Sequence, residues 1–141
     1  VLEAARAAGA GAEALVCEGV GGLLVPLADD YLVRDLAVDL ALPLVVAASP
    51  GLGTINHTLQ TLITAAVFRN GLDVAGIVLN RLADSAQDPS CDSNFDEIAR
   101  HARPPLLADV AWNAQHFAET VDWHFLARPY QTPPARRPRT S

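Results

Sequence analysis

Residues 44–54 read Leu-Val-Val-Ala-Ala-Ser-Pro-Gly-Leu-Gly-Thr, an apolar run that passes directly into a glycine-rich turn. A short apolar run bounded by turn residues is typical of a strand buried in a parallel sheet. Thr54 stands where it could cap a following helix, and Gly71 where it could end that helix. The apolar residues between them recur at helical spacing: Ile55, Leu59, Leu62, Ile63, Ala66 and Val67. Residues 44–71 therefore predict a strand, a glycine turn and a long helix.

The same alternation extends to both sides of this stretch. Three further apolar runs predict buried strands, and they lie at residues 13–17, 74–79 and 106–110. Amphipathic or alanine-rich patterns predict helices, which lie at residues 1–10, 31–40 and 95–102, with a closing helix within residues 112–127. Residues 26–30 are expected to form a turn, and residues 82–93 a polar loop. The order predicts an α/β fold with a mainly parallel sheet flanked by helices.

The chain is expected to form one domain over residues 1–127 and a disordered tail over residues 128–141, which hold four prolines and four arginines. Half of its 141 residues are hydrophobic, so a core can form. The net charge of −6 argues against nucleic acid as a partner. The longest apolar stretch, residues 40–48, is about half of a membrane span, so a cytoplasmic protein is expected.

Two residue types are missing from the chain: all ten basic residues are arginine, and there is no methionine. Chemistry that needs a lysine is therefore excluded from this chain alone. Because Val1 enters directly into a helical pattern, we interpret the sequence as a fragment or as one that starts at a non-standard codon. Cys17 and Cys91 lack metal-ligand spacing and are predicted to be free thiols, with Cys17 buried and Cys91 in the polar loop.

Ligands of parallel α/β sheets bind outside the carboxyl ends of the strands, so the chemistry is expected in the loops after residues 18, 48, 79 and 110. Glu18 precedes the glycine-rich residues 19–22 at one of these ends. A carboxylate beside an open backbone suits Mg²⁺ that bridges to phosphate oxygens. The alternative is a solvated glutamate at the end of a strand.

The turn at residues 51–54 leads into a predicted helix, whose amino terminus would offer free N–H groups and a positive dipole end to an anion. It lacks the lysine and the spacing of a phosphate-binding P-loop, so a carboxylate is the better guest. The alternative is an ordinary turn between a strand and a helix. His57, in the first helical turn, is interpreted as a structural residue.

Asn80, at the end of the strand at residues 74–79, could present its amide to a planar heterocycle, or it could simply terminate the strand. The remaining candidates for metal binding show no ligand spacing and are assigned no role: Cys91, His101, His116 and His124.

Taken together, four segments closely resemble the carboxyl-terminal half of the dethiobiotin synthetase family. They are residues 18–27 (EGVGGLLVPL), 42–46 (LPLVV), 51–59 (GLGTINHTL) and 76–80 (GIVLN). The resemblance runs from about residue 10 to about residue 125 and implies an incomplete fold of the P-loop NTPase type. It also implies ATP- and Mg²⁺-dependent carboxylation of 7,8-diaminononanoate with CO₂ and closure of the product to dethiobiotin.

The resemblance assigns roles to individual positions. Glu18 matches the Mg²⁺ ligand of the family, and Asn80 matches its adenine-reading asparagine. Residues Gly19, Val20, Gly21 and Gly22 match the backbone that lines the diamine end of the substrate. Residues Gly51, Leu52, Gly53 and Thr54 match the grip on the substrate carboxylate, which the family makes across the interface of a homodimer.

The departures from the family are equally specific. The P-loop with its lysine, a second substrate lysine and an aspartate at the Mg²⁺ belong to the amino-terminal half of the family, which is absent here, so this chain alone is expected to be inactive. Ala108 and Ala111 replace the usual glycine and proline beside the adenine, and Glu119 is not assigned as an adenine partner. Two alternatives stay open: a non-catalytic remnant or binding subunit, and a related amidoligase.

Overall fold

The structure is a computed structural model, and it describes residues 1–82 and 90–128. The five helices and five strands in this part of the chain are α1 (Leu2–Gly9), β1 (Pro26–Ala28), β2 (Tyr31–Leu32), α2 (Val33–Leu40), β3 (Leu44–Ala48), α3 (Thr54–Val67), β4 (Val74–Asn80), α4 (Ser90–His101), β5 (Leu106–Val110) and α5 (Trp123–Leu126). None of these helices is long and apolar enough to span a bilayer.

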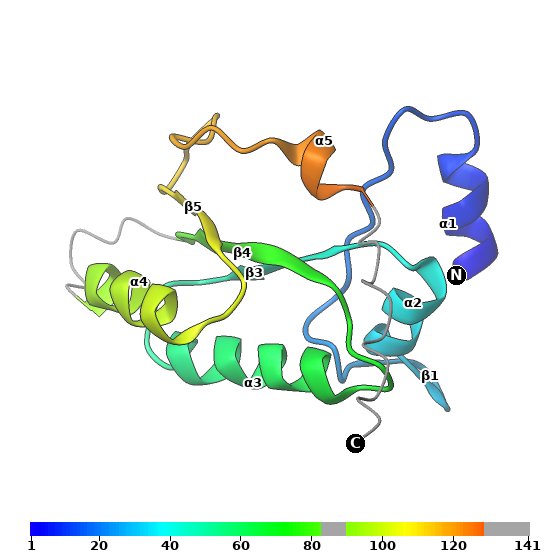
Figure 1. Ribbon diagram of the computed structural model, residues 1–141, viewed down its shortest axis with the longest axis horizontal. Helices are drawn as coiled ribbons and strands as arrows, with labels where there is room; N and C mark the ends of the chain where they lie inside the picture. The colour runs from blue at the N-terminus through cyan, green and yellow to red at the C-terminus, as the bar shows by residue number, and fades with distance from the viewer. Residues whose placement is uncertain (83–89, 129–141) are drawn as a thin grey trace, which may run out of the picture.

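The main sheet contains β3, β4 and β5 in that order, and both neighbouring pairs are parallel. Ala48 is in register with Leu79, and Asn80 is in register with Val110, so the three strands end at the same edge (Figure 1). Of the four loops predicted to share one edge, those after residues 48, 79 and 110 do so, whereas the loop after residue 18 follows no strand of this sheet, and that part of the prediction is not confirmed. The predicted α/β fold with a parallel sheet and flanking helices is confirmed as well.

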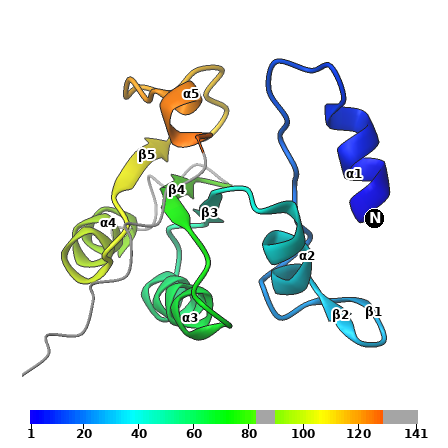
Figure 2. The ribbon, with the colours of Figure 1, turned by 45° about the vertical axis from the view of Figure 1, so that its right-hand side comes forward.

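Helices α3 and α4 lie side by side against one face of this sheet (Figures 1 and 2). The core forms between them and the sheet, where Ile77 and Leu79 of β4 meet Ile98 of α4, and all three side chains are fully buried. Alternate residues of a strand point to opposite faces, which is why Ile77 and Leu79 share this side. Burial of apolar surface at this interface orients α3 and α4 on the sheet.

The strand predicted at residues 13–17 is absent, and this prediction was wrong. These residues are described, yet they pair with no strand, and Val16 is 93% exposed. The order β3-β4-β5 leaves β3 and β5 each with one unpaired edge among the described residues, and residues 13–17 pair with neither, so they gain none of the ladder hydrogen bonds that stabilise a strand. Cys17 is consequently exposed rather than buried.

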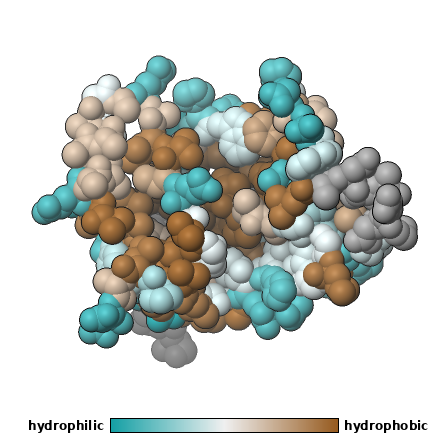
Figure 3. Space-filling model, turned by 180° about the vertical axis from the view of Figure 1, so that it is seen from behind, coloured by the Kyte–Doolittle hydropathy of each residue, from teal (hydrophilic) through white to brown (hydrophobic). Residues whose placement is uncertain are grey.

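Hydrophobic side chains remain exposed over much of the face drawn in Figure 3. Val45 of β3 is 42% exposed, and Ile63 and Val67 of α3 are 62% and 73% exposed. Apolar residues at such positions usually lie against another element or another chain.

The region between residues 26 and 40 also differs from the prediction. The expected turn at 26–30 contains strand β1, which pairs antiparallel with β2 and leaves only Asp29 and Asp30 in the turn. Helix α2 begins at Val33 rather than Tyr31 because Asp35 accepts a hydrogen bond from the N–H of Leu32, at 3.0 Å, and so fixes the start of the helix.

Helix α4 begins at Ser90, five residues before the predicted start at 95. The polar residues at its start stabilise the helix rather than a loop, since Ser93 donates to the carbonyl of Ser90 at 2.9 Å and Asp92 places a negative charge in the first turn. Cys91 is therefore buried in a helix and does not lie in a loop. The rest of the predicted loop, residues 83–89, and the predicted tail from residue 129 onward lie outside the described residues.

The cap of α3 also corrects the sequence analysis. Gly53 is the residue before the helix, and the Thr54 hydroxyl, which was expected to cap it, makes no hydrogen bond. At the other end α3 stops at Val67, before Gly71, because Phe68 leaves the helical conformation with ψ of 118°. Gly71 lies in the turn that follows, with φ of +88°.

Candidate binding site at the carboxyl edge of the sheet

A cavity of about 250 Å³ opens beside the turn that joins β3 to α3. Its walls include Ser49 and Gly51 from the turn and Thr54, His57 and Thr58 from α3. The carboxyl end of β3, residues 46–48, forms another wall. The structure therefore places the predicted carboxylate turn next to an open cavity of the size of a small organic group.

The conformation of this turn depends on Gly53. Its φ of +89° lies in the left-handed region, and a Cβ at this position would approach Cε1 of His57 to 3.3 Å. The N–H of Thr54 donates to the carbonyl of Gly51 at 3.1 Å, and the N–H of His57 donates to the carbonyl of Gly53 at 3.0 Å. No side chain caps α3, so the first turn of this 14-residue helix presents its amino-terminal dipole to the cavity without a protein carboxylate.

Two threonine hydroxyls on the cavity wall have no hydrogen-bond partner among the described residues. Thr54 is 5% exposed and Thr58 is 2% exposed, and the Oγ1 atoms of both are buried. An unsatisfied buried hydroxyl costs about 1–3 kcal/mol. Both side chains line the cavity while their Oγ1 atoms are shielded from solvent, so the open first turn of α3 is the feature here that suits an organic acid.

Replacing Thr58 by valine is expected to raise the free energy of unfolding of the unliganded chain by about 1 kcal/mol, because an unpaired polar group is exchanged for an apolar one of the same shape. Urea denaturation monitored by circular dichroism measures the change. Thr61→Val is the matched control on the same helix, because the hydroxyl of Thr61 does donate, to the carbonyl of His57 at 2.9 Å. A Thr58→Val variant less stable than the wild type would contradict the interpretation.

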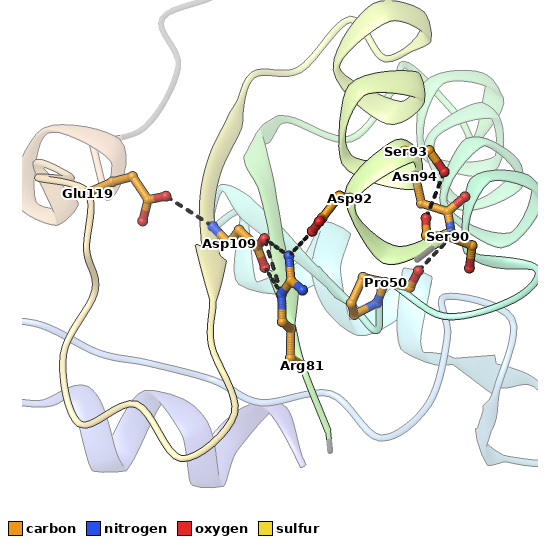
Figure 4. Close-up of polar contacts among 8 residues, drawn as sticks. All are labelled: Pro50, Arg81, Ser90, Asp92, Ser93, Asn94, Asp109 and Glu119. Atoms are coloured by element: carbon orange, nitrogen blue, oxygen red, sulfur yellow. Dashed lines mark hydrogen bonds and ion pairs between the residues drawn. The ribbon is translucent and has the colours of Figure 1, made fainter. Parts of the chain in front are cut away.

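A charged cluster lies at the same edge, directly after Asn80. The N–H of Arg81 donates to the carbonyl of Val110 at 3.0 Å and continues the ladder between β4 and β5. Its guanidinium Nε donates to Oδ1 of Asp109 at 3.0 Å, and its Nη2 donates to Oδ1 of Asp92 at 2.9 Å (Figure 4). One cation thus links β4, β5 and the first turn of α4.

The Arg81–Asp109 pair is the better shielded of these two contacts. The side chains of Arg81 and Asp109 are 18% and 19% exposed, whereas that of Asp92 is 84% exposed. Hydrogen bonds to Asp109, and secondly to Asp92, raise the pKa of the Arg81 guanidinium, so it stays charged at every working pH. Asn80 is exposed beside this pair, and its position is consistent with contact to a ligand.

The loop at residues 18–22 is a turn on the protein surface, and Glu18 is exposed. Gly21 has φ of +70°, and a Cβ there would come within 2.9 Å of Cγ2 of Val25. A Cβ on Gly19 would lie 3.2 Å from Cγ1 of Val33. The loop therefore lies against Val25, just before β1, and against the first residue of α2, and no hydrogen bond in the described part of the chain joins it to the turn at residues 51–54.

The loop at residues 18–22 contains one carboxylate that could bind a metal ion, that of Glu18. Among residues 1–82 and 90–128, no group of three or more His, Cys, Asp or Glu side chains could hold a metal. Mg²⁺ is commonly bound through one or two carboxylates together with water and substrate phosphates, so the single exposed Glu18 fits such a partial site and does not form a complete one. The role of Glu18 as a metal ligand remains a prediction.

Four side chains at this edge are not identified by sequence reasoning. Arg81 and Asp109 were not paired, although charged residues at the ends of adjacent strands are a signal for such a pair. Thr58 was overlooked because a threonine within a helix gives no sequence signal of an unpaired hydroxyl. Glu119, to which no role was assigned, accepts a hydrogen bond from the N–H of Asp109 at 3.4 Å (Figure 4).

Comparison with known proteins agrees with this fold. A family model described as an AAA domain matches residues 2–120. An ATP-dependent dethiobiotin synthetase BioD of Anaeromyxobacter dehalogenans is 50% identical over 112 residues, which are 79% of this chain and 49% of that protein. The enzyme of the same name from Bacillus subtilis is 39% identical over 109 residues, which are 77% of this chain and 46% of that protein. The chain spans about half the length of the curated relatives it matches, and its resemblance to dethiobiotin synthetases is confirmed.

Proposed function

The chain belongs to the AAA domain family, and on this premise we propose that residues 1–127 are the carboxyl-terminal part of a dethiobiotin synthetase domain. The proposed reaction is the ATP- and Mg²⁺-dependent carboxylation of 7,8-diaminononanoate with CO₂, followed by ring closure to dethiobiotin. The names of the relatives support the activity, since each is called an ATP-dependent dethiobiotin synthetase.

The observation that carries the proposal is the acid-binding geometry at the start of α3. The proposed substrate is an organic acid, and its carboxylate suits the uncapped terminus of α3 beside the cavity. The residues proposed to bind it are Gly51, Leu52, Gly53 and Thr54. Gly19, Val20, Gly21 and Gly22 are proposed to line the diamine end of the substrate, where small residues allow the main chain to approach closely.

The proposed positions for the metal and the nucleotide are Glu18 and Asn80. ATP supplies the phosphoryl group that activates the carbamate, and Mg²⁺ neutralises charge on its phosphates. Glu18 is proposed to hold the metal, and Asn80 to read the adenine edge with its amide donor and acceptor. The chain has no lysine, so it cannot supply the P-loop lysine of such a site, and alone it is expected to be inactive.

Replacing Asn80 by alanine is expected to raise the KM for ATP about tenfold or more, because an amide that pairs with a base contributes about 1–3 kcal/mol of discrimination. The KM for the diamine acid should stay unchanged, since the turn at residues 51–54 is untouched. Steady-state kinetics with ATP and GTP measure the effect, with the chain combined with a separately expressed amino-terminal half that contains a P-loop. An unaltered preference for ATP would exclude Asn80 as the reader of the base.

The proposal includes a homodimer in the cytoplasm without nucleic acid as a partner. The exposed apolar residues Leu52, Ile63 and Val67, on α3 and the turn before it, support a second copy that covers this helix. The dimer matters for function because the family makes its grip on the carboxylate across that interface.

The activity is tested with labelled bicarbonate. The chain is mixed with ATP, Mg²⁺ and the diamine acid, with and without a separately expressed amino-terminal half that contains a P-loop. We call the mixture of the two halves the reconstituted enzyme. Labelled dethiobiotin is expected from this mixture and not from the chain by itself. No product from the reconstituted enzyme would favour the second candidate, a non-catalytic subunit that binds a carboxylate, which the missing lysine supports.

A further inference from the structure

Asn94 connects α4 to the turn that precedes α3. Its Nδ2 donates to the main-chain carbonyl of Pro50 at 2.7 Å, and the same nitrogen lies 3.5 Å from the carbonyl of Gly51 (Figure 4). Pro50 is buried, and Asn94 is half-buried. The two ends of this contact are 44 residues apart in sequence, so it exists only because the fold brings α4 beside the turn.

The turn has few restraints of its own. Gly51 and Gly53 carry no side chains, and ordering glycine costs more backbone entropy than ordering any other residue. No side chain caps α3, so the capping bond that commonly fixes such a turn is missing. The hydrogen bond from Asn94 therefore supplies a restraint that the turn lacks.

Helix α4 is itself held firmly at the point where Asn94 projects. Ile98, one turn further on, is fully buried in the core against Ile77 and Leu79. Asp92, two residues earlier, accepts from Arg81, which also binds Asp109 at the end of β5. A side chain on such an anchored element can hold its partner in a narrow range of positions.

We propose that Asn94 is a positioning residue that fixes the acid-binding turn at residues 51–54 relative to the ends of β4 and β5. The inference rests on the proposed function, because it takes this turn as the site of the substrate carboxylate. The start of α4 then restrains both loops of the site. Asp92 binds Arg81, the residue after Asn80, and Asn94 binds the carbonyl of Pro50, next to the turn that lines the cavity. Groups fixed before the substrate arrives bind it without a further cost of ordering.

Hydrogen exchange tests the restraint without reference to activity. In the full chain, Asn94→Ala and Asn94→Asp are expected to speed exchange of the amides of Thr54 and His57 about fivefold, the equivalent of one hydrogen bond. Asn94→Asp has nearly the same shape but cannot donate, so it separates the hydrogen bond from packing. Asp96→Ala, a change at an exposed position of the same helix, should leave these amides unaffected. Unchanged exchange in Asn94→Asp overturns the inference.

Kinetics of the reconstituted enzyme test the consequence. Both Asn94 variants are expected to raise the KM for the diamine acid about fivefold and to leave the KM for ATP unchanged, whereas Asp96→Ala changes neither. Faster exchange with an unchanged KM for the acid overturns the inference, because the turn would then not be the acid site. If the wild-type reconstituted enzyme has no activity, the proposed function is wrong. The exchange experiment still decides whether Asn94 restrains the turn.

Discussion

Replacing Glu18 by glutamine in the reconstituted enzyme is expected to lower kcat at least about 100-fold. The change keeps the size of the side chain and its carbonyl oxygen but removes the negative charge that a metal ion needs. Loss of one group that stabilises charge in a transition state costs about 100- to 1000-fold in rate. The rate is measured at saturating ATP and diamine acid over a range of Mg²⁺ concentrations, and half-maximal activity should require more Mg²⁺ than in the wild type.

Glu13→Gln is the matched control for this experiment. Glu13 is another exposed glutamate, five residues earlier in the same segment, and no role is assigned to it. Its replacement should leave both kcat and the Mg²⁺ dependence unchanged. An active Glu18→Gln variant with wild-type Mg²⁺ dependence would remove Glu18 from the site.

Replacing Leu79 by alanine is expected to lower the free energy of unfolding by about 3–4 kcal/mol. Leu79 is fully buried on the central strand β4, where it packs with Ile77 and Ile98. Truncation of a buried leucine removes apolar contacts and leaves a cavity that the core fills only in part. Urea denaturation followed by circular dichroism measures the loss.

Leu82→Ala provides the comparison, since Leu82 is 64% exposed and has no assigned role. It should change stability by less than about 0.5 kcal/mol, because little apolar surface is lost from contact with other groups. Equal losses in the two variants would show that the core does not lie between β4 and the helices.

Strands β3, β4 and β5 were recognised from short apolar runs, and β3 and β5 have the predicted bounds. Such runs are informative because central parallel strands are buried on both faces. The run at residues 13–17 has the same pattern, and yet it forms no strand. The pattern reports that a segment is able to join a sheet, but the ladder requires a neighbouring strand, and local sequence does not say whether one is present.

The glycine turn at residues 51–54 was also predicted from sequence, and the structure places it beside a cavity. The residue before the helix was misassigned, because Thr54 is a common capping residue by type, whereas the left-handed geometry at this position requires Gly53. Residue types thus identified the turn, whereas its backbone conformation determined that Gly53, and not Thr54, is the residue before the helix.

The sequence by itself determined the three strands of the main sheet, the edge at which the loops after them meet and the family that the chain resembles. These properties depend on apolar periodicity and on contiguous motifs, both of which are local. Only the tertiary structure decided that Asn94 holds the carbonyl of Pro50 and that Arg81 pairs with Asp109. Those contacts join residues 44 and 28 positions apart, and they form only because the core of Ile77, Leu79 and Ile98 packs α4 and β5 against β4.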